Sequence, residues 1–316
     1  MNMPEQLKII FMGTPEIALP SAEELIASGE DLIAVVTQPD RPKGRGRVCE
    51  ACAVKEWALM NNLPVLQPEK AREPQFLEEV RKLNPDLIVV HAFGQILPKA
   101  LLEIPKFGVI NVHASLLPKY RGAAPAQWAI LNGEPETGVT IMRMDEKLDT
   151  GPILLQQKVP IEDSDTTGTL LRKLSELGRE LLLSAVQGLK AGTIKAVPQD
   201  ESQATYAPPI DKEQGKINWN EPVLLIWRKV RAFNPWPGAY LGEGNNLIKI
   251  WKAEPAEGKG EPGMILEAHN KWIEVACAQG SLRILELQPA GKRRMSAEAF
   301  LAGRKLKPGD KFALKS

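Results

Sequence analysis

Short runs of apolar residues recur through the first half of the chain, separated by segments with the spacing of amphipathic helices. The runs lack the alternation of a half-exposed strand, and continuous apolar strands are typical of parallel sheets covered on both faces. The expected strands span residues 7–12, 32–37, 63–66, 86–90, 108–113, 137–144 and 153–157. Strands that alternate with helices in this way predict a doubly wound α/β fold with a mostly parallel, Rossmann-like sheet.

The intervening helices are marked by apolar spacing and by residues that favour helix ends. Ser21 and Glu24 have the spacing of a capping box, which predicts that a helix begins at Ser21. The other expected helices span residues 50–61, 73–83 and 170–189. Each of these carries an apolar stripe at helical spacing, so each is expected to pack one face against the sheet.

The pattern changes after about residue 190. Residues 191–208 are polar and irregular, which predicts an interdomain linker. Beyond it, short apolar runs are separated by Gly, Asn and Pro turns, which favours a small, OB-like β-barrel. We therefore predict an α/β domain over residues 1–190, the linker over 191–208 and a C-terminal barrel over 209–316.

Charge is unevenly distributed along a chain that otherwise has the composition of a soluble globular protein. Hydrophobic residues make up 43% of the chain and charged residues 25%. Residues 1–208 carry 22 Lys and Arg against 27 Asp and Glu, whereas residues 209–316 carry 18 against 12. A basic C-terminal part favours an anionic partner such as nucleic acid, although a basic surface is more often only solvated.

Cysteine usage and the start of the chain exclude several other classes. Three cysteines do not make a disulfide framework. Cys49 and Cys52 lack a second pair or a nearby histidine to complete a zinc site, so we predict no metal. No apolar run approaches the about 18 residues of a transmembrane helix, and residues 1–6 do not resemble a secretory signal. We therefore expect a cytoplasmic monomer with no membrane contact.

The densest polar cluster lies at the end of the expected strand 108–113. Asn111 and His113 are two residues apart and so point to the same face. An amide and an imidazole at the carboxyl end of such a strand can aim hydrogen bonds at one oxygen that becomes negatively charged. Asp149, in a turn between two expected strands, can orient His113 or accept a proton. Each residue alone is more often an ordinary surface or turn residue, and His91 is expected to be a packing histidine, with ligand contact as the alternative.

A longer motif surrounds these residues. The string Asn-Val-His-Ala-Ser-Leu-Leu-Pro at 111–118, with Asp-Thr-Gly at 149–151, resembles the signature of the folate-dependent formyltransferases. The resemblance covers nearly the whole chain and implies transfer of the formyl group of 10-formyltetrahydrofolate, with Asn111, His113 and Asp149 as catalytic residues. It also implies a folate site lined by Phe93, Gly94, Ser115, Leu116, Leu117 and Pro118.

A basic loop at residues 38–48 bears on the acceptor of the formyl group. Its cations are Arg41, Lys43, Arg45 and Arg47, which alternate with Pro and Gly. A flexible loop of this kind can contact phosphates, and family members that act on tRNA carry an insertion here whose key arginine matches Arg45. The resemblance thus implies that methionyl initiator tRNA is the acceptor and a reduced folate the donor. The alternatives are a small amine such as a nucleotide sugar, hydrolysis of the formyl-folate, and a non-catalytic tRNA-binding module.

Overall fold

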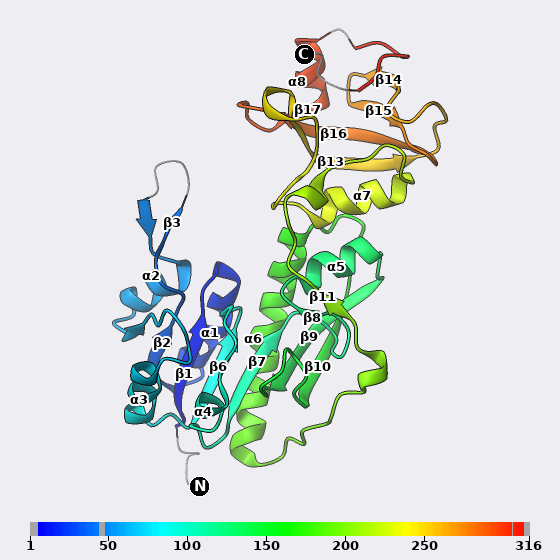
Figure 1. The fold of residues 1–316 in the computed structure, drawn as a ribbon. Helices are drawn as coiled ribbons and strands as arrows, with labels where there is room; N and C mark the ends of the chain where they lie inside the picture. The colour runs from blue at the N-terminus through cyan, green and yellow to red at the C-terminus, as the bar shows by residue number, and fades with distance from the viewer. Residues whose placement is uncertain (1–5, 44–47, 305, 313–316) are drawn as a thin grey trace. The chain divides into compact units, whose positions relative to one another are not determined.

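The structure, a computed structural model, describes residues 6–43, 48–304 and 306–312 and separates into two units. Unit 1 consists of Met1–Pro125, Glu136–Pro160 and Leu171–Pro208, and unit 2 of Ala126–Pro135, Ile161–Leu170 and Pro209–Ser316. Figure 1 labels most helices and strands of both units. None of the helices within the described ranges combines the length and the hydropathy needed to span a bilayer.

Unit 1 is organised around one sheet whose strands follow the order β10-β9-β7-β6-β1-β2-β5. The strands are β1 (Lys8–Gly13), β2 (Asp31–Val36), β5 (Val65–Leu66), β6 (Leu87–His91), β7 (Val109–His113), β9 (Glu136–Arg143) and β10 (Ile153–Pro160). Pairing is parallel from β7 to β5, and β9 and β10 add an antiparallel edge. The predicted mostly parallel α/β sheet is confirmed.

The order of the strands reverses at β1, which pairs with β2 on one side and with β6 on the other. In open α/β sheets, ligands bind beyond the carboxyl ends of the strands at such a reversal. Here that place lies beside Gly13, the last residue of β1, and its register partner His91, the last residue of β6. Because β7 is the neighbour of β6, the end of β7 lies next to this place.

Helices cover both faces of the sheet. They are α1 (Leu19–Ala27), α2 (Ala53–Met60), α3 (Pro74–Leu83), α4 (Lys99–Leu102) and α6 (Thr167–Ala191), with the 3-10 turn η1 (Glu16–Ala18) before α1. On one face, Ile88 and Val90 of β6 pack in a cluster with Phe76 of α3. On the other, α6 approaches β7 so closely that a Cβ on Gly178 would lie 2.9 Å from Val112. Coverage of both faces explains why the strands are continuously apolar.

Unit 2 contains an antiparallel sheet in the order β12-β13-β16-β15-β14, with β17 beside β16. Its strands are β12 (Ala239–Leu241), β13 (Ile248–Ala256), β14 (Ile265–His269), β15 (Trp272–Ala276), β16 (Ser281–Pro289) and β17 (Met295–Ser296). Its helices are α5 (Pro125–Asn132), η3 (Glu213–Gly215), α7 (Val223–Ala232), η4 (Gly244–Asn246) and α8 (Ala297–Ala302). The first residue of α5, Pro125, is the last residue of the first segment of unit 1. Ile226 of α7 and Ile284 of β16 belong to the same buried cluster. The predicted C-terminal β unit is confirmed, with α7 as an unpredicted part of its core.

Two local predictions are wrong. The helix expected from residue 50 begins at Ala53, because Val48–Glu50 forms β4, which pairs antiparallel with β3 (Arg41–Lys43). The capping box at Ser21 does not form either. Helix α1 begins at Leu19 with a proline in its first turn, a position that proline favours, so Ser21 lies inside the helix and is fully buried.

Residues 197–207, which we call the strap, hydrogen-bond with the α/β part of the chain. The strap contains η2 (Glu201–Gln203) and ends in β11 (Tyr206–Ala207), which runs parallel to β8 (Arg121–Gly122). At its other end, Val197 forms an antiparallel bridge with Ile153 of β10. The polar residues of the segment 191–208 therefore bind unit 1, of which they are part. The predicted domain limits stay a prediction.

Candidate active site

Asn111 and His113 lie at the carboxyl end of β7. Strand alternation places both on the same face of the sheet as Val109, whose side chain packs with the α3 and α4 cluster. Asn111 is 9% exposed and His113 is 6% exposed. Within the described ranges, no hydrogen bond joins the Asn111 carboxamide to another residue, so its donors are available to a ligand.

The two nitrogens of the His113 ring have different partners. Nε2 donates a hydrogen bond to the backbone carbonyl of Tyr120 at 3.0 Å, because a carbonyl can only accept. Nδ1 lies 3.7 Å from Asp149 Oδ2, which is ion-pair distance when the ring is protonated. Since Nε2 is used within the protein, Nδ1 is the nitrogen that remains for proton transfer.

Asp149 lies in a tight turn after β9. Its φ of 53° is in the left-handed region, which Asp tolerates better than most residues. Its Oδ2 accepts the backbone N–H of Gly122 at 2.8 Å. The turn packs against β9 so closely that a Cβ on Gly151 would lie 1.8 Å from the Arg143 carbonyl oxygen. The structure therefore brings Asp149, which is distant in sequence, beside His113 as expected.

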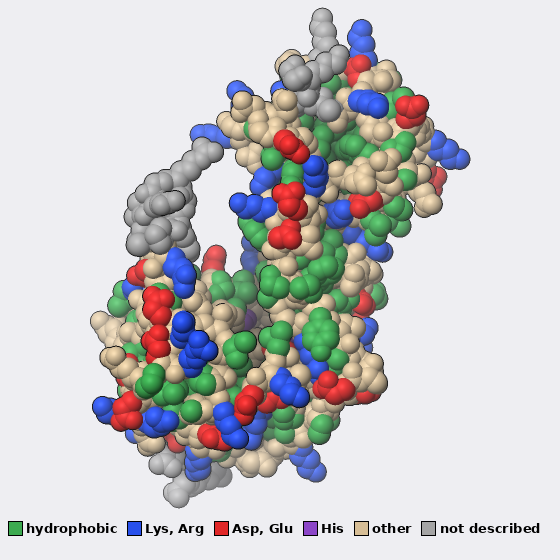
Figure 2. Space-filling model, in the orientation of Figure 1, with side chains coloured by type: hydrophobic (Ala, Val, Ile, Leu, Met, Phe, Trp, Pro, Cys, Tyr) green, Lys and Arg blue, Asp and Glu red, His purple; other side chains and the backbone are tan. Residues whose placement is uncertain are grey.

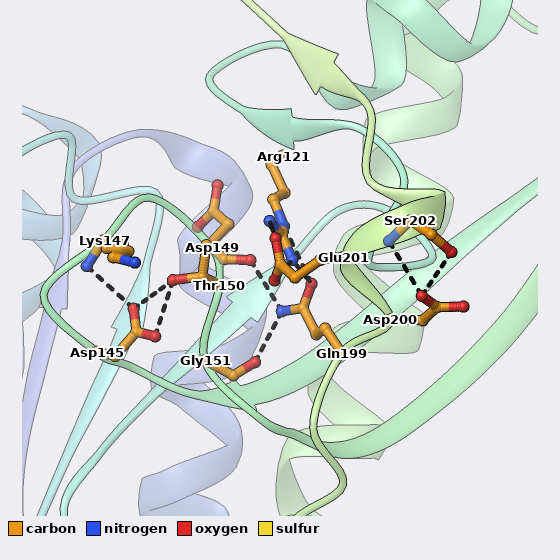
Figure 3. A network of polar contacts seen from close by, with 10 residues as sticks. All are labelled: Arg121, Asp145, Lys147, Asp149, Thr150, Gly151, Gln199, Asp200, Glu201 and Ser202. Carbon is orange, nitrogen blue, oxygen red and sulfur yellow. Dashed lines mark hydrogen bonds and ion pairs between the residues drawn. The ribbon is translucent and has the colours of Figure 1, made fainter.

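A network that the sequence analysis missed surrounds this turn (Figure 3). Arg121 forms hydrogen bonds with Gln199 and an ion pair with Glu201, and Gln199 also binds the backbone of the Asp149 turn. Gln199 and Glu201 belong to the polar segment read as a linker. Neither lies in a motif or a periodic pattern, so the sequence carried no local signal for this contact.

The segment expected to line the folate site is fixed from β9. Thr140 Oγ1 donates to the carbonyl of Ser115 at 2.6 Å and accepts the N–H of Leu117 at 3.1 Å. Gln156 of β10 adds bonds to Thr140 Oγ1 and to the carbonyl of Leu117. Ser115 and Leu117 are buried, whereas Leu116 and Pro118 are partly exposed. The exposed pair is therefore the part of this segment that a ligand can contact.

Phe93 and Gly94 follow β6, beside the reversal of the strand order. The Phe93 ring is 2% exposed and belongs to the core, so its side chain is not available to a ligand. Its backbone carbonyl accepts Gln38 Nε2 at 3.0 Å, which ties the end of β6 to the residues that follow β2. Gly94 is exposed and has a φ of 84°. The folate contacts of both residues stay a prediction.

The basic segment expected to meet tRNA is only partly described. Arg41 and Lys43 lie in β3, and the exposed Arg41 guanidinium is 3.9 Å from Glu69. Arg45 and Arg47 lie outside the described residues. Figure 2 shows Lys and Arg side chains interspersed with Asp and Glu on the visible face, with no large patch of one sign among the described residues.

His91 is buried and hydrogen-bonded, in agreement with the packing role that the sequence favoured. Its Nδ1 lies 2.9 Å from Ser21 Oγ of α1, and its side chain is 5% exposed. Burial, with a smaller contribution from the nearby charge of His113, lowers the pKa of His91 to about 4. His91 is therefore neutral at neutral pH. Among the described residues, no group of three or more His, Cys, Asp or Glu could hold a metal ion.

Comparison with known sequences assigns the family. The profile of the family described as "Formyl transferase" matches residues 7–186, which is more than half of the chain. The chain belongs to the formyl transferase family. A second profile, described as "Formyl transferase, C-terminal domain", matches residues 209–305. The two profiles together cover both the α/β part and the C-terminal β part of this chain.

Relatives within the family match over nearly their whole length. A protein of Citrifermentans bemidjiense named methionyl-tRNA formyltransferase is 53% identical over 303 residues, which cover 96% of this chain and 95% of the relative. A protein of the same name from Thermodesulfovibrio yellowstonii is 50% identical, with 96% and 99% covered. At this identity and coverage, both units of the chain have counterparts in these relatives.

Solved structures share the fold at lower identity. WlaRD, described as a sugar 3N-formyl transferase, has a TM-score of 0.66 and 24% identity, with 92% of this chain and 100% of that chain covered. HypX of Aquifex aeolicus in complex with tetrahydrofolic acid has a TM-score of 0.66 and 19% identity, with 94% of this chain and 47% of that chain covered. At these identities the likeness shows the fold alone.

The low pKa of His91 predicts that stability falls in acid. As pH decreases from 6.5 to about 4, the unfolded chain binds a proton at this imidazole before the folded chain does. The free energy of unfolding should therefore fall by up to about 3 kcal/mol over this window. Urea unfolding at several pH values measures the loss, which His91→Gln should reduce. The exposed His269→Gln serves as control, and an equal loss in wild type and His91→Gln would contradict the assignment.

Proposed function

We propose that this protein transfers the formyl group of 10-formyltetrahydrofolate to the α-amine of methionyl initiator tRNA. The observation that carries the proposal is the match to relatives named methionyl-tRNA formyltransferase, at 48–53% identity for those at the top of the comparison, over both units. The arrangement of Asn111, His113 and Asp149 supports it, because each can serve one requirement of acyl transfer to an amine. Their catalytic roles, the cytoplasmic location and the monomeric state are part of the proposal.

Asn111 stabilises the negative charge that develops on the formyl oxygen. Attack by the amine turns the formyl carbon tetrahedral and leaves its oxygen as an oxyanion. The Asn111 carboxamide has free N–H donors and is almost buried at a strand end, where a hydrogen bond to an anion is stronger than in water. Because β7 is paired on both sides, with β6 and β9, the backbone of this donor is rigidly placed.

His113 carries the proton from the attacking amine to the leaving nitrogen. With Nε2–H bound to Tyr120, neutral His113 presents the Nδ1 lone pair as a base. The amine nitrogen forms its bond to the formyl carbon and loses a proton to Nδ1, and the resulting imidazolium is stabilised by Asp149 at 3.7 Å. The same proton then passes to N10 of the folate as the bond between N10 and the formyl carbon breaks.

The acceptor is held by cations and not by the reacting groups alone. Arg41 is exposed at the start of β3, and residues 209–316, the largest segment of unit 2, carry 18 Lys and Arg against 12 Asp and Glu. Phosphate contacts of this kind position a nucleic acid without reading its sequence. They support an aminoacyl-tRNA over a small amine, which offers far fewer phosphates.

The direct test is formyl transfer from 10-formyltetrahydrofolate to methionyl initiator tRNA, compared with methionyl elongator tRNA, free methionine and an amino-sugar nucleotide. We expect the highest kcat/KM with the initiator tRNA. Affinity for the tRNA should fall steeply between about 50 and about 200 mM salt, because bound cations are released from the tRNA phosphates. Preference for the amino sugar, or formate release without transfer, would favour the alternative activities. Absence of any turnover with all of these acceptors would favour the remaining alternative, a non-catalytic tRNA-binding module.

Replacement of the oxyanion donor should slow the chemical step. We expect Asn111→Ala to lower kcat by roughly 10²–10³, the usual loss for one such donor, with a small change in KM. Asn61→Ala, at the exposed end of α2, removes a carboxamide far from β7 and should leave kcat unchanged. Wild-type kcat in Asn111→Ala, measured by steady-state transfer to methionyl-tRNA, would remove Asn111 from the mechanism.

A further inference from the structure

The Arg121 guanidinium is buried, although charged side chains are rarely fully buried unless they are paired. Its side chain is fully inaccessible to solvent, and Nη1 and Nη2 bind the two oxygens of Glu201 at 2.9 and 2.7 Å. A buried charge is costly unless it is paired, and the partner here, Glu201, keeps 68% of its side chain exposed. Arg121 is therefore held by polar partners on the strap, of which Glu201 is one.

Gln199 links this ion pair to the turn that carries Asp149. Its Oε1 accepts Nε and Nη2 of Arg121 at 3.1 and 2.8 Å. Its Nε2 donates both hydrogens to the turn, one to the carbonyl of Asp149 at 2.9 Å and one to that of Gly151 at 2.7 Å. The amide has its two acceptor sites and its two donors occupied, so Arg121 fixes which way it points.

The Asp149 turn needs such support. Asp149 has left-handed backbone geometry, which an L-residue adopts at a cost and keeps only where its surroundings impose it. The carboxylate is held separately, by the N–H of Gly122, the residue after Arg121. Gly122 in turn lies in β8, which is paired with β11 of the strap, and a Cβ on Gly122 would lie 2.6 Å from the Ala207 carbonyl oxygen. Backbone and carboxylate of Asp149 are thus both fixed through the strap.

We propose that Gln199, oriented by Arg121 and Glu201, is a positioning residue that holds the Asp149 carboxylate toward His113. The role rests on the proposed function, because it matters only where Asp149 assists proton transfer. Gln199 touches no reacting atom in this scheme and acts through the backbone of Asp149 and Gly151.

The informative substitution is Gln199→Glu. It keeps an acceptor for Arg121 and so leaves the strap anchored, but it replaces two N–H donors by an oxygen that repels the carbonyls of Asp149 and Gly151. Gln75→Glu makes the same chemical change at an exposed position of α3, where the Gln75 side chain has no hydrogen bond to another described residue, and serves as the matched control.

Hydrogen exchange tests the placement independently of activity. Backbone amides of residues 145–151 should exchange faster in Gln199→Glu than in wild type, and at the wild-type rate in Gln75→Glu. Unchanged exchange in Gln199→Glu would overturn the proposal. This result stands even if the wild-type chain fails to formylate methionyl-tRNA, a failure that would refute the proposed function separately.

Kinetics test the route through Asp149. Gln199→Glu should lower kcat about 10- to 100-fold, as expected for misplacement of a reacting group by about 1 Å, with little change in KM. In an Asp149→Asn background the same substitution should lower kcat no further, because the group that it positions is already lost. Losses that multiply in the double variant would show that Gln199 acts independently of Asp149 and would overturn the proposal.

Discussion

The hydrogen bond from His113 Nε2 to the carbonyl of Tyr120 is the contact on which the proposed chemistry depends. It assigns the proton of the neutral ring to Nε2 and leaves the Nδ1 lone pair on the side of Asp149. Tyr120 presents this carbonyl from left-handed backbone geometry, and its own N–H is bound by Thr205 Oγ1 of the strap at 2.8 Å. The orientation of a strand residue is therefore set from a segment that follows it by about ninety positions.

The strap thus acts on both members of the pair, His113 through Tyr120 and Asp149 through Gln199. Asn111 is the exception, since it is placed by the β7 backbone alone. The site thus contains two kinds of rigid group. The donor Asn111 is rigid because its strand is paired on both sides, and the titratable His113 and Asp149 are rigid because a distant segment binds them. This separation of the oxyanion donor from the proton-transfer pair suits acyl transfer, in which the oxyanion position must stay fixed while a proton moves.

The sequence predicted what depends on local patterns and could not predict what depends on distant polar contacts. Apolar runs identified the strands of the main sheet of unit 1 and the presence of short strands in unit 2, because a strand buried on both faces is apolar at successive positions. Alternation placed Asn111 and His113 on one face, and the motif brought in Asp149. The capping box at Ser21 was a wrong prediction, because the Ser21 hydroxyl hydrogen-bonds with His91 in the core and does not cap a helix.

The strap was missed for a physical reason. Gln199 and Glu201 bind one guanidinium and two backbone carbonyls, and no periodicity accompanies such contacts. Polar residues in an irregular segment look the same whether they face water or a buried arginine. Thr140 was overlooked in a similar way, since its hydroxyl serves the backbone of the neighbouring segment from within an apolar strand.

A structure of the protein with a stable formyl-folate analogue tests the central claim most directly. The account predicts that the formyl oxygen lies within about 3 Å of Asn111 Nδ2, a normal hydrogen-bond distance, with His113 Nδ1 and Asp149 facing the same formyl carbon. A formyl group bound away from the end of β7, with Asn111 and His113 in contact with no part of it, would contradict the account.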